Sequence, residues 1–183
     1  MLRKLLYTAI IYVLSLAVAN AGSLCPGSFY VAPTIVYQTM SLPGIGYNGI
    51  APRLTLGYED MLTPVIYTAA EIFTNPTTIK VYNNPNNMGS LRVTYSYGAS
   101  ILPGISFADN VTVGYIRLGV IKTRFDNLGK IRSGFQYGVG VKWGLNDLWS
   151  VRGEYSYTKY NNIVNFGHPD SNTYSIGLMY SFA

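Results

Sequence analysis

Beyond residue 25, apolar side chains alternate with small or polar ones over stretches of about ten residues. Clusters of Asn, Asp, Gly and Pro separate these stretches, and a helical period does not appear in them. A period of two predicts β-strands that have one apolar and one polar face. Eight such segments are recognised, at residues 28–40, 49–59, 64–74, 90–102, 110–123, 133–145, 148–160 and 172–183.

The polar faces of these segments distinguish a membrane barrel from a soluble β-sandwich. In a sandwich the apolar face points inward, and the other face meets water and carries many Lys and Glu residues. Here the polar face of 133–145 holds Gln136, Gly138, Gly140 and Lys142, and the polar face of the other segments is similarly small and sparsely charged. Small side chains suit the narrow interior of an eight-stranded barrel, so the pattern favours the barrel.

The composition agrees with a membrane protein built from strands. Only 11% of the 183 residues are charged, 14% are aromatic and the mean hydropathy is +0.18, which excludes disorder. One cysteine excludes a disulfide framework, and the single long apolar run lies at the N-terminus, which excludes a polytopic helical protein. A β-sheet that crosses a lipid bilayer must close into a barrel, because an open edge would leave backbone N–H and C=O groups without partners. We therefore predict an all-β fold, an eight-stranded antiparallel transmembrane β-barrel with an up-and-down meander.

The first 21 residues have the pattern of a cleaved secretory signal peptide. Arg3 and Lys4 precede an apolar run over residues 5–18, and Ala19-Asn20-Ala21 provides the small residues of a cleavage site. The alternative, an uncleaved anchor, needs about 20 apolar residues and this run is shorter. The predicted domains are a signal peptide at 1–21 and a barrel at 22–183.

The mature chain has neither the charge of a nucleic-acid-binding protein nor the signal of a lipoprotein. Without Arg3 and Lys4 it keeps 11 basic and 8 acidic residues, a net charge of +3, so we expect no nucleic-acid partner. Cys25 follows Leu24, whereas a lipoprotein signal needs a small residue there, so we interpret Cys25 as a free thiol.

The connections between segments alternate in length and thereby predict an orientation. Short connections are expected at 60–63, 103–109 and 146–147, and longer ones at 41–48, 75–89, 124–132 and 161–171. Small outer-membrane barrels have short periplasmic turns and longer outer loops. Both termini are therefore expected in the periplasm, and recognition by the four outer loops is expected at the cell surface.

The alternation also predicts which charges point into the lumen, because Arg or Lys at the bilayer midplane would cost about 2–4 kcal/mol on the lipid face. The predicted lumenal charges are Arg53, Glu71, Arg92, Arg117, Lys142, Arg152 and Glu154. Five are basic and two are acidic. One interpretation is a plug of ion pairs; the other is a narrow, gated, anion-leaning pore.

A second basic group lies around the third long connection, at Lys122, Arg124, Lys130 and Arg132. Lys and Arg bind phosphate through charge-assisted contacts, so these residues are candidates for contact with lipopolysaccharide. A solvated loop tip is the alternative.

Enzymatic chemistry has one candidate, His168, with Asp170 and Ser171 close by in the fourth long connection. A triad could be drawn from these three residues, but Pro169 and the turn-like context favour a loop histidine. A single His and a distant single Cys do not form a zinc site, and no phosphate loop or dinucleotide fingerprint is present. We expect no enzyme activity, no metal and no cofactor.

Three stretches resemble the opacity-like and outer membrane protein A-like family of small bacterial barrels: residues 137–142 with their alternating Gly, residues 146–157 with an inward Arg-x-Glu, and residues 174–182. The resemblance implies an integral outer-membrane protein that serves envelope integrity, adhesion or host interaction. It also implies that the barrel-assembly machinery reads the terminal strand through Tyr174, Ile176, Leu178, Tyr180 and Phe182, which Ala183 follows here.

The sequence thus predicts a monomeric surface barrel that acts through four outer loops, with outer-membrane lipid, lipopolysaccharide and host surface molecules as partners. A small porin-like channel is the first alternative, and a lipid-modifying hydrolase centred on His168 is the second.

Overall fold

The computed structural model describes residues 27–42, 45–76, 93–107, 111–125, 130–161 and 170–182. The predicted signal peptide, Cys25, Arg92 and His168 lie outside these residues. Within the described ranges, no helix is long and apolar enough to cross a membrane.

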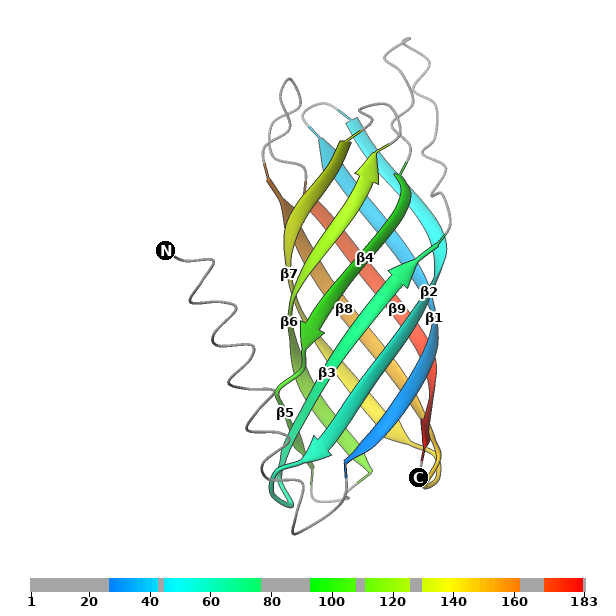
Figure 1. Cartoon of the computed structure of the whole chain (residues 1–183), viewed down its shortest axis with the longest axis vertical. Coiled ribbons are helices and arrows are strands. Elements are labelled where there is room, and N and C mark those ends of the chain that lie inside the picture. The colour runs from blue at the N-terminus through cyan, green and yellow to red at the C-terminus, as the bar shows by residue number, and fades with distance from the viewer. Residues whose placement is uncertain are drawn as a thin grey trace.

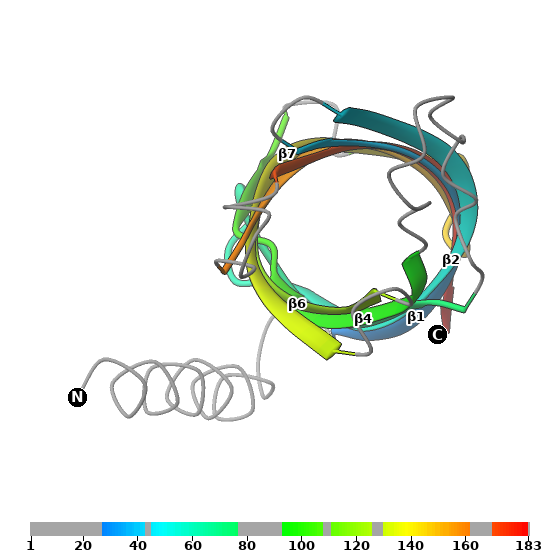
Figure 2. The same ribbon diagram turned by 90° about the horizontal axis from the view of Figure 1, so that it is seen from above.

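The described chain forms one closed antiparallel sheet that winds around a central axis (Figures 1 and 2). Its strands are β1 (Ser28–Leu42), β2 (Ile45–Met61), β3 (Ile66–Asn75), β4 (Val93–Ile101), β5 (Gly104–Ser106), β6 (Thr112–Phe125), β7 (Lys130–Gly144), β8 (Trp149–Tyr160) and β9 (Asp170–Phe182). β4 and β5 both pair with β3 and with β6, every other strand pairs with the next along the chain, and β1 pairs with β9 to close the ring. The predicted eight-stranded meander is confirmed, because β4 and β5 are two parts of a single fourth strand.

Pro103 divides that fourth strand without ending it. Leu102 exchanges backbone hydrogen bonds with Ala69 at 2.8 and 3.1 Å, and Ile116 donates to the Pro103 carbonyl at 3.0 Å. The pairing with β3 and β6 resumes in the same register at Gly104. Proline removes only its own N–H from the ladder, so the expected connection at 103–109 was placed too early.

The barrel has two different ends. One, the turn end, carries the hairpin connections at 62–65 and 145–148, while the other, the loop end, carries the connections from β3 to β4 and from β8 to β9. Thr63 and Asn146 accept backbone N–H groups within their turns, at 2.9 Å from Ile66 and 2.8 Å from Trp149. These are the Asx and ST turns that such residues favour.

One expected long connection is short. β1 continues to Leu42 and β2 begins at Ile45, and these two residues pair with each other. The connection predicted at 41–48 is therefore reduced to residues 43 and 44, because backbone pairing continues past the end of the clear alternation.

The strands alternate as predicted in the parts of the barrel where pairing is regular. On β7, the outward side chains Phe135, Tyr137, Val139, Val141 and Trp143 are 50–61% exposed. On β8, Ser150, Arg152, Glu154, Ser156 and Thr158 are all buried inside. An exposed wall of this kind suits hydrocarbon, because a soluble protein rarely exposes so large an apolar surface.

A β-bulge reverses this alternation at the start of β4. The register with β6 shifts between Val93 and Tyr95, and Val93 is buried although its place in the alternation predicted an outward position. A bulge inserts one extra residue, and one residue exchanges the two faces of a strand.

The charged lumen as candidate functional site

The lumen is filled in layers, and its turn-end half is mainly apolar. Side chains from opposite walls pack there into one cluster, which Met61 borders. Its members are Tyr30, Ala32, Tyr67, Ala69, Leu102, Val113, Tyr115 and Met179. An eight-stranded barrel leaves an interior just wide enough for such side chains, so this half has a packed core.

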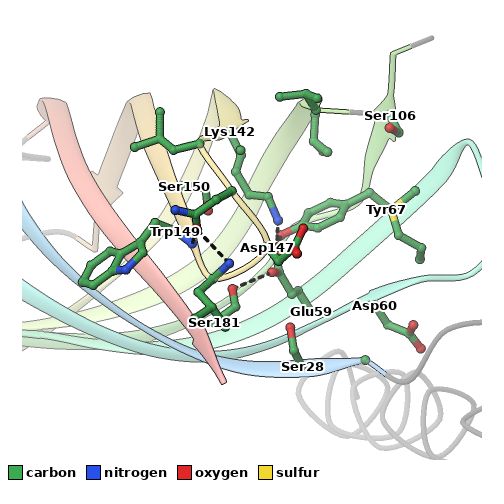
Figure 3. A pocket seen from close by; sticks show the side chains of 18 of the residues that line it. Ser28, Glu59, Asp60, Tyr67, Ser106, Lys142, Asp147, Trp149, Ser150 and Ser181 are labelled. Atoms are coloured by element: carbon green, nitrogen blue, oxygen red, sulfur yellow. Dashed lines mark hydrogen bonds and ion pairs between the residues drawn. The ribbon is translucent and has the colours of Figure 1, made fainter. Parts of the chain in front are cut away.

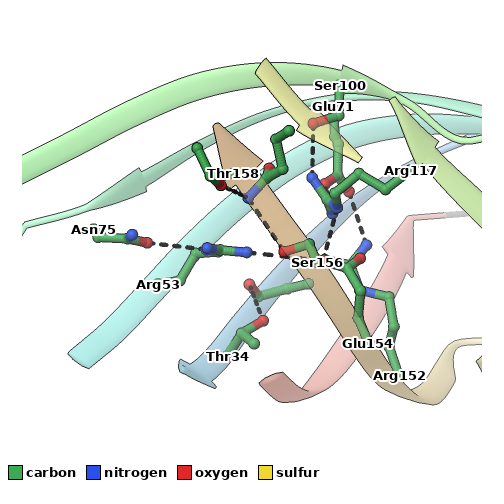
Figure 4. A network of polar contacts seen from close by, with 12 residues as sticks. Thr34, Arg53, Glu71, Asn75, Ser100, Arg117, Arg152, Glu154, Ser156 and Thr158 are labelled. Carbon is green, nitrogen blue, oxygen red and sulfur yellow. Dashed lines mark hydrogen bonds and ion pairs between the residues drawn. The ribbon is translucent and has the colours of Figure 1, made fainter. Parts of the chain in front are cut away.

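Glu71 on β3 is the centre of a charged layer beside that core (Figure 4). Its carboxylate forms ion pairs with Arg117 and with Arg152, the second at 2.8 Å, and accepts the Tyr30 hydroxyl at 2.8 Å. β8, which carries Arg152, lies four strands away from β3 in either direction around the ring. The pair of Glu71 and Arg152 therefore joins opposite walls.

Glu154 on β8 is the second acidic group of this layer. Its Oε1 lies 2.7 Å from Arg117 Nε and 3.9 Å from Arg53 Nη1, and its Oε2 accepts the Tyr115 hydroxyl at 3.0 Å. Arg117 thus contacts both carboxylates, and its Nη1 also donates to Ser100 Oγ at 2.7 Å. All of these side chains are buried. Because Arg117 contacts both carboxylates, they form one connected network.

Arg53 on β2 is held by side chains of the neighbouring strand β3. Its Nε donates to Asn75 Oδ1 at 2.9 Å, and Asn75 in turn donates to Ser96 Oγ at 2.8 Å. The guanidinium lies over the Phe73 ring, 4.8 Å from its centroid. We name the layer formed by Arg53, Glu71, Arg117, Arg152 and Glu154 the central Arg–Glu layer.

A separate ion pair crosses the lumen near the turn end (Figure 3). Lys142 on β7 lies 2.6 Å from Glu59 on β2, again four strands apart around the ring. Glu59 also accepts hydroxyls from Tyr67 at 2.9 Å and Ser181 at 3.1 Å. This group borders a cavity of about 710 Å³ that includes residues of both described turns.

The loop-end half of the lumen is lined by hydroxyl and amide groups. Gln38 donates to Ser171 Oγ at 2.7 Å, and the hydroxyls of Thr123 and Tyr160 lie 3.0 Å apart. Gln136 donates to Ser156 at 3.2 Å. These side chains are uncharged, and the ion pairs that join opposite walls of the described lumen lie at the central Arg–Glu layer and between Lys142 and Glu59.

The structure places six of the seven predicted lumenal charges inside: Arg53, Glu71, Arg117, Lys142, Arg152 and Glu154. Arg92 lies outside the described residues. Glu59 was missed, although it lies six positions from Arg53 and so shares its face of β2. The described ion pairs join four basic and three acidic side chains, so Glu59 lowers the positive excess of these described side chains from two to one.

The predicted basic group does not form one patch. Lys122 and Arg124 are exposed on the outward face of β6. Arg132 pairs with Thr123, whose side chain is fully buried, and Arg132 therefore lies on the lumen side of β7. Lys130 pairs with Phe125 in the backbone register. Sequence separation in a loop had grouped residues that the pleat sends to opposite faces.

The remaining predicted residues that the structure describes lie on the last strand, β9. The residues of the proposed assembly signal, Tyr174, Ile176, Leu178, Tyr180 and Phe182, lie along the outward-facing side of β9. Ser171 is fully buried against Gln38 in the lumen. Among the described residues, no group of three or more His, Cys, Asp or Glu could hold a metal ion.

Comparisons with known proteins agree with this architecture. Neisserial surface protein A has a similar structure, with a TM-score of 0.64 and 20% identity over 85% of this chain and 99% of that one. Ail, the attachment invasion locus protein of Yersinia pestis, has a TM-score of 0.59 and 12% identity over the same shares of both chains, in a complex with the heparin analogue sucrose octasulfate. No curated protein matches this chain.

A family model described as "Outer membrane protein beta-barrel domain" matches residues 13–182. The match covers the whole closed sheet with its charged lumen. The chain therefore belongs to the outer membrane protein beta-barrel domain family and is an integral protein of the bacterial outer membrane.

Proposed function

We propose that this chain is a closed surface barrel, whose lumen is plugged and whose role in envelope integrity, adhesion or host interaction is exerted through its loop end. In this proposal the loop end faces the exterior and both termini lie in the periplasm. The barrel is monomeric, is inserted by the barrel-assembly machinery through its terminal strand, and contacts lipopolysaccharide and host surface molecules. We assign it no catalytic role.

The observation that carries the proposal is the contact between Arg152 and Glu71 from opposite walls. A pair at 2.8 Å leaves no aqueous path between its two members. Each of the seven charged side chains described above takes part in an ion pair, so their charges are compensated by one another. The packed turn-end cluster supports the same conclusion.

The similarity to Ail supports an interaction role. That protein is an attachment invasion locus protein and binds a heparin analogue in its structure. At 12% identity the likeness shows the shared fold alone.

A gated channel is the second candidate, and one observation favours it. The central Arg–Glu layer lies between a hydroxyl-lined half and the cavity of about 710 Å³ at the turn end. Rearrangement of these ion pairs together with the side chains of the packed turn-end cluster would then open a path through the lumen.

Planar-bilayer recording of the purified chain tests the proposal. Heat-modifiable gel migration of the same sample reports the folded fraction, and a porin of known conductance serves as the positive control. We expect folded protein without single-channel steps over a range of salt and voltage. Steady conductance from the folded wild type would overturn the plug and support the channel.

Two variants make the result specific. The double variant Glu71→Ala/Arg117→Ala removes the centre of the layer and is expected to show steps if it folds, and Arg152→Ser is the milder version. Lys122→Gln, on the outer wall, removes a charge without touching the lumen and is expected to remain silent.

A further inference from the structure

Basic side chains on the outer wall of the barrel gather at one end. Lys122 and Arg124 lie close to the loop end of β6, and Lys159 lies close to the loop end of β8. All three are exposed and share the outward face with the apolar side chains of their strands. Among the described residues of the turn end, the outward faces and turns carry no Lys or Arg.

These three cations are neighbours in the sheet. β7 lies between β6 and β8, and its residues Ser133 and Phe135 pair with Lys122 and Lys159 respectively. Neighbouring strands are about 4.8 Å apart and the register offsets the two lysines by two residues of about 3.4 Å each, so their backbone positions are roughly 12 Å apart along the wall. Such a spacing suits an anionic group between them or two groups side by side.

Aromatic rings extend this group over β4. Tyr97 pairs with Lys122 and Tyr95 pairs with Arg124, and the two rings stack with centroids 6.2 Å apart. We name Lys122, Arg124, Lys159, Tyr95, Tyr97 and Phe135 the basic–aromatic patch. Asp170, opposite Lys159 on β9, places a negative charge at its edge, which leaves a net charge of +2.

The patch lies directly beyond an apolar wall. Leu118 and Val120 precede Lys122 on the same face of β6 and are 45% and 40% exposed. Long basic side chains at this level extend their stems along apolar surface and place the charge among headgroups. Tyr residues favour the same depth at the membrane interface.

We propose that the basic–aromatic patch binds the phosphate groups of a lipopolysaccharide molecule in the outer leaflet. Lys and Arg would hold the phosphates through charge-assisted hydrogen bonds, and Leu118 and Val120 would contact the acyl chains. The lateral position distinguishes this ligand from a soluble polyanion, because a lipid reaches the wall within the plane of the membrane. The inference rests on the proposed function, since it needs the loop end to face the exterior.

Binding of the full chain to purified lipid A tests the inference. The detergent-folded protein is titrated with diphosphorylated lipid A, with the monophosphorylated form and with a dephosphorylated form. Each cation near a charged lipid surface contributes a factor of about five in affinity, so we expect Lys122→Gln/Arg124→Gln/Lys159→Gln to lose roughly 100-fold. The wild type should likewise bind the monophosphorylated and dephosphorylated forms more weakly than diphosphorylated lipid A.

Arg132→Gln is the matched control, because it removes the same charge at the same end but from the lumen side. Its affinity for lipid A should stay at the wild-type level. Equal binding of all three lipid forms, or equal losses in Arg132→Gln and the triple variant, would overturn the inference. Binding of heparin to these residues without binding of lipid A would overturn it as well.

These outcomes are distinguishable from a failure of the proposed function. The triple variant leaves the lumen intact and should stay silent in planar bilayers like the wild type. If neither protein conducts and the triple variant binds lipid A as well as the wild type does, only the lipopolysaccharide site is contradicted. If both proteins conduct, only the plugged lumen is contradicted.

Discussion

Arg152 and Glu71 meet at 2.8 Å in the centre of the lumen although their strands lie on opposite sides of the ring. The contact needs the full length of an arginine side chain on one wall and a glutamate on the other. Arg117 reaches the same carboxylate from β6, so two guanidinium groups share one acceptor. Each group in this arrangement depends on the others for its charge balance.

Neutralising Glu71 is therefore expected to destabilise the barrel strongly. Glu71→Gln leaves Arg117 and Arg152 with reduced compensation in a buried site, and breaking a buried pair typically costs about 3–5 kcal/mol. Reversible urea unfolding in lipid vesicles, followed by gel mobility, measures the change. Asp147→Asn in the exposed turn removes the same kind of charge and should cost less than about 0.5 kcal/mol. Equal free energies of unfolding for the two variants would contradict the network's structural importance.

Gly140 and Gly153 provide a matched pair for the packing of the lumen. A Cβ at Gly140 would collide with the ring of Tyr115, whose hydroxyl binds Glu154, whereas a Cβ at Gly153 meets nothing within 4 Å. We expect Gly140→Ala to destabilise by about 1–3 kcal/mol through overpacking. Gly153→Ala should be neutral or slightly stabilising, because it removes backbone freedom from the unfolded chain. The same unfolding measurement decides, and a neutral Gly140→Ala would show that the lumen has unfilled space.

A charged side chain on the outer wall is expected to destabilise the barrel. Val139, in the middle of β7 and 57% exposed, faces outward between two aromatic positions. Val139→Arg should cost about 2–4 kcal/mol if this face meets the bilayer midplane. Asp147→Arg, at an exposed position of the turn, should cost less than about 0.5 kcal/mol. A tolerated arginine at position 139 would place that face in water.

Labelling with a membrane-impermeant maleimide tests the orientation, in a Cys25→Ser background. Asn83→Cys lies in the connection between β3 and β4, and Asn146→Cys lies in a hairpin of the turn end. Intact cells should label position 83, and position 146 should react only after the outer membrane is permeabilised. The reverse pattern would place the loop end in the periplasm and would remove the basis of the lipopolysaccharide site.

Glu59 is a lumenal charge that the alternation alone could have predicted. It shares the face of Arg53 on β2 and was therefore accessible to the same argument that placed Arg53. Val93 shows the limit, because the bulge before Tyr95 reverses the faces and the sequence of β4 carries no clear sign of it. Pro103 was misleading for a related reason, since a proline at a position that needs only its carbonyl can stay within a strand.

The sequence by itself determined the fold class, the number of strands and the side of the wall for most residues. Side-chain direction in a strand is a local property with a period of two, and composition decides whether the apolar face meets lipid. The tertiary structure decided which charges meet. Arg152 and Glu71 are 81 residues apart, and only the closure of β1 on β9 and the stagger of the strands bring them to one level. Lys122 and Arg132 were separated by the local alternation of β6 and β7, which extends into the connection predicted at 124–132.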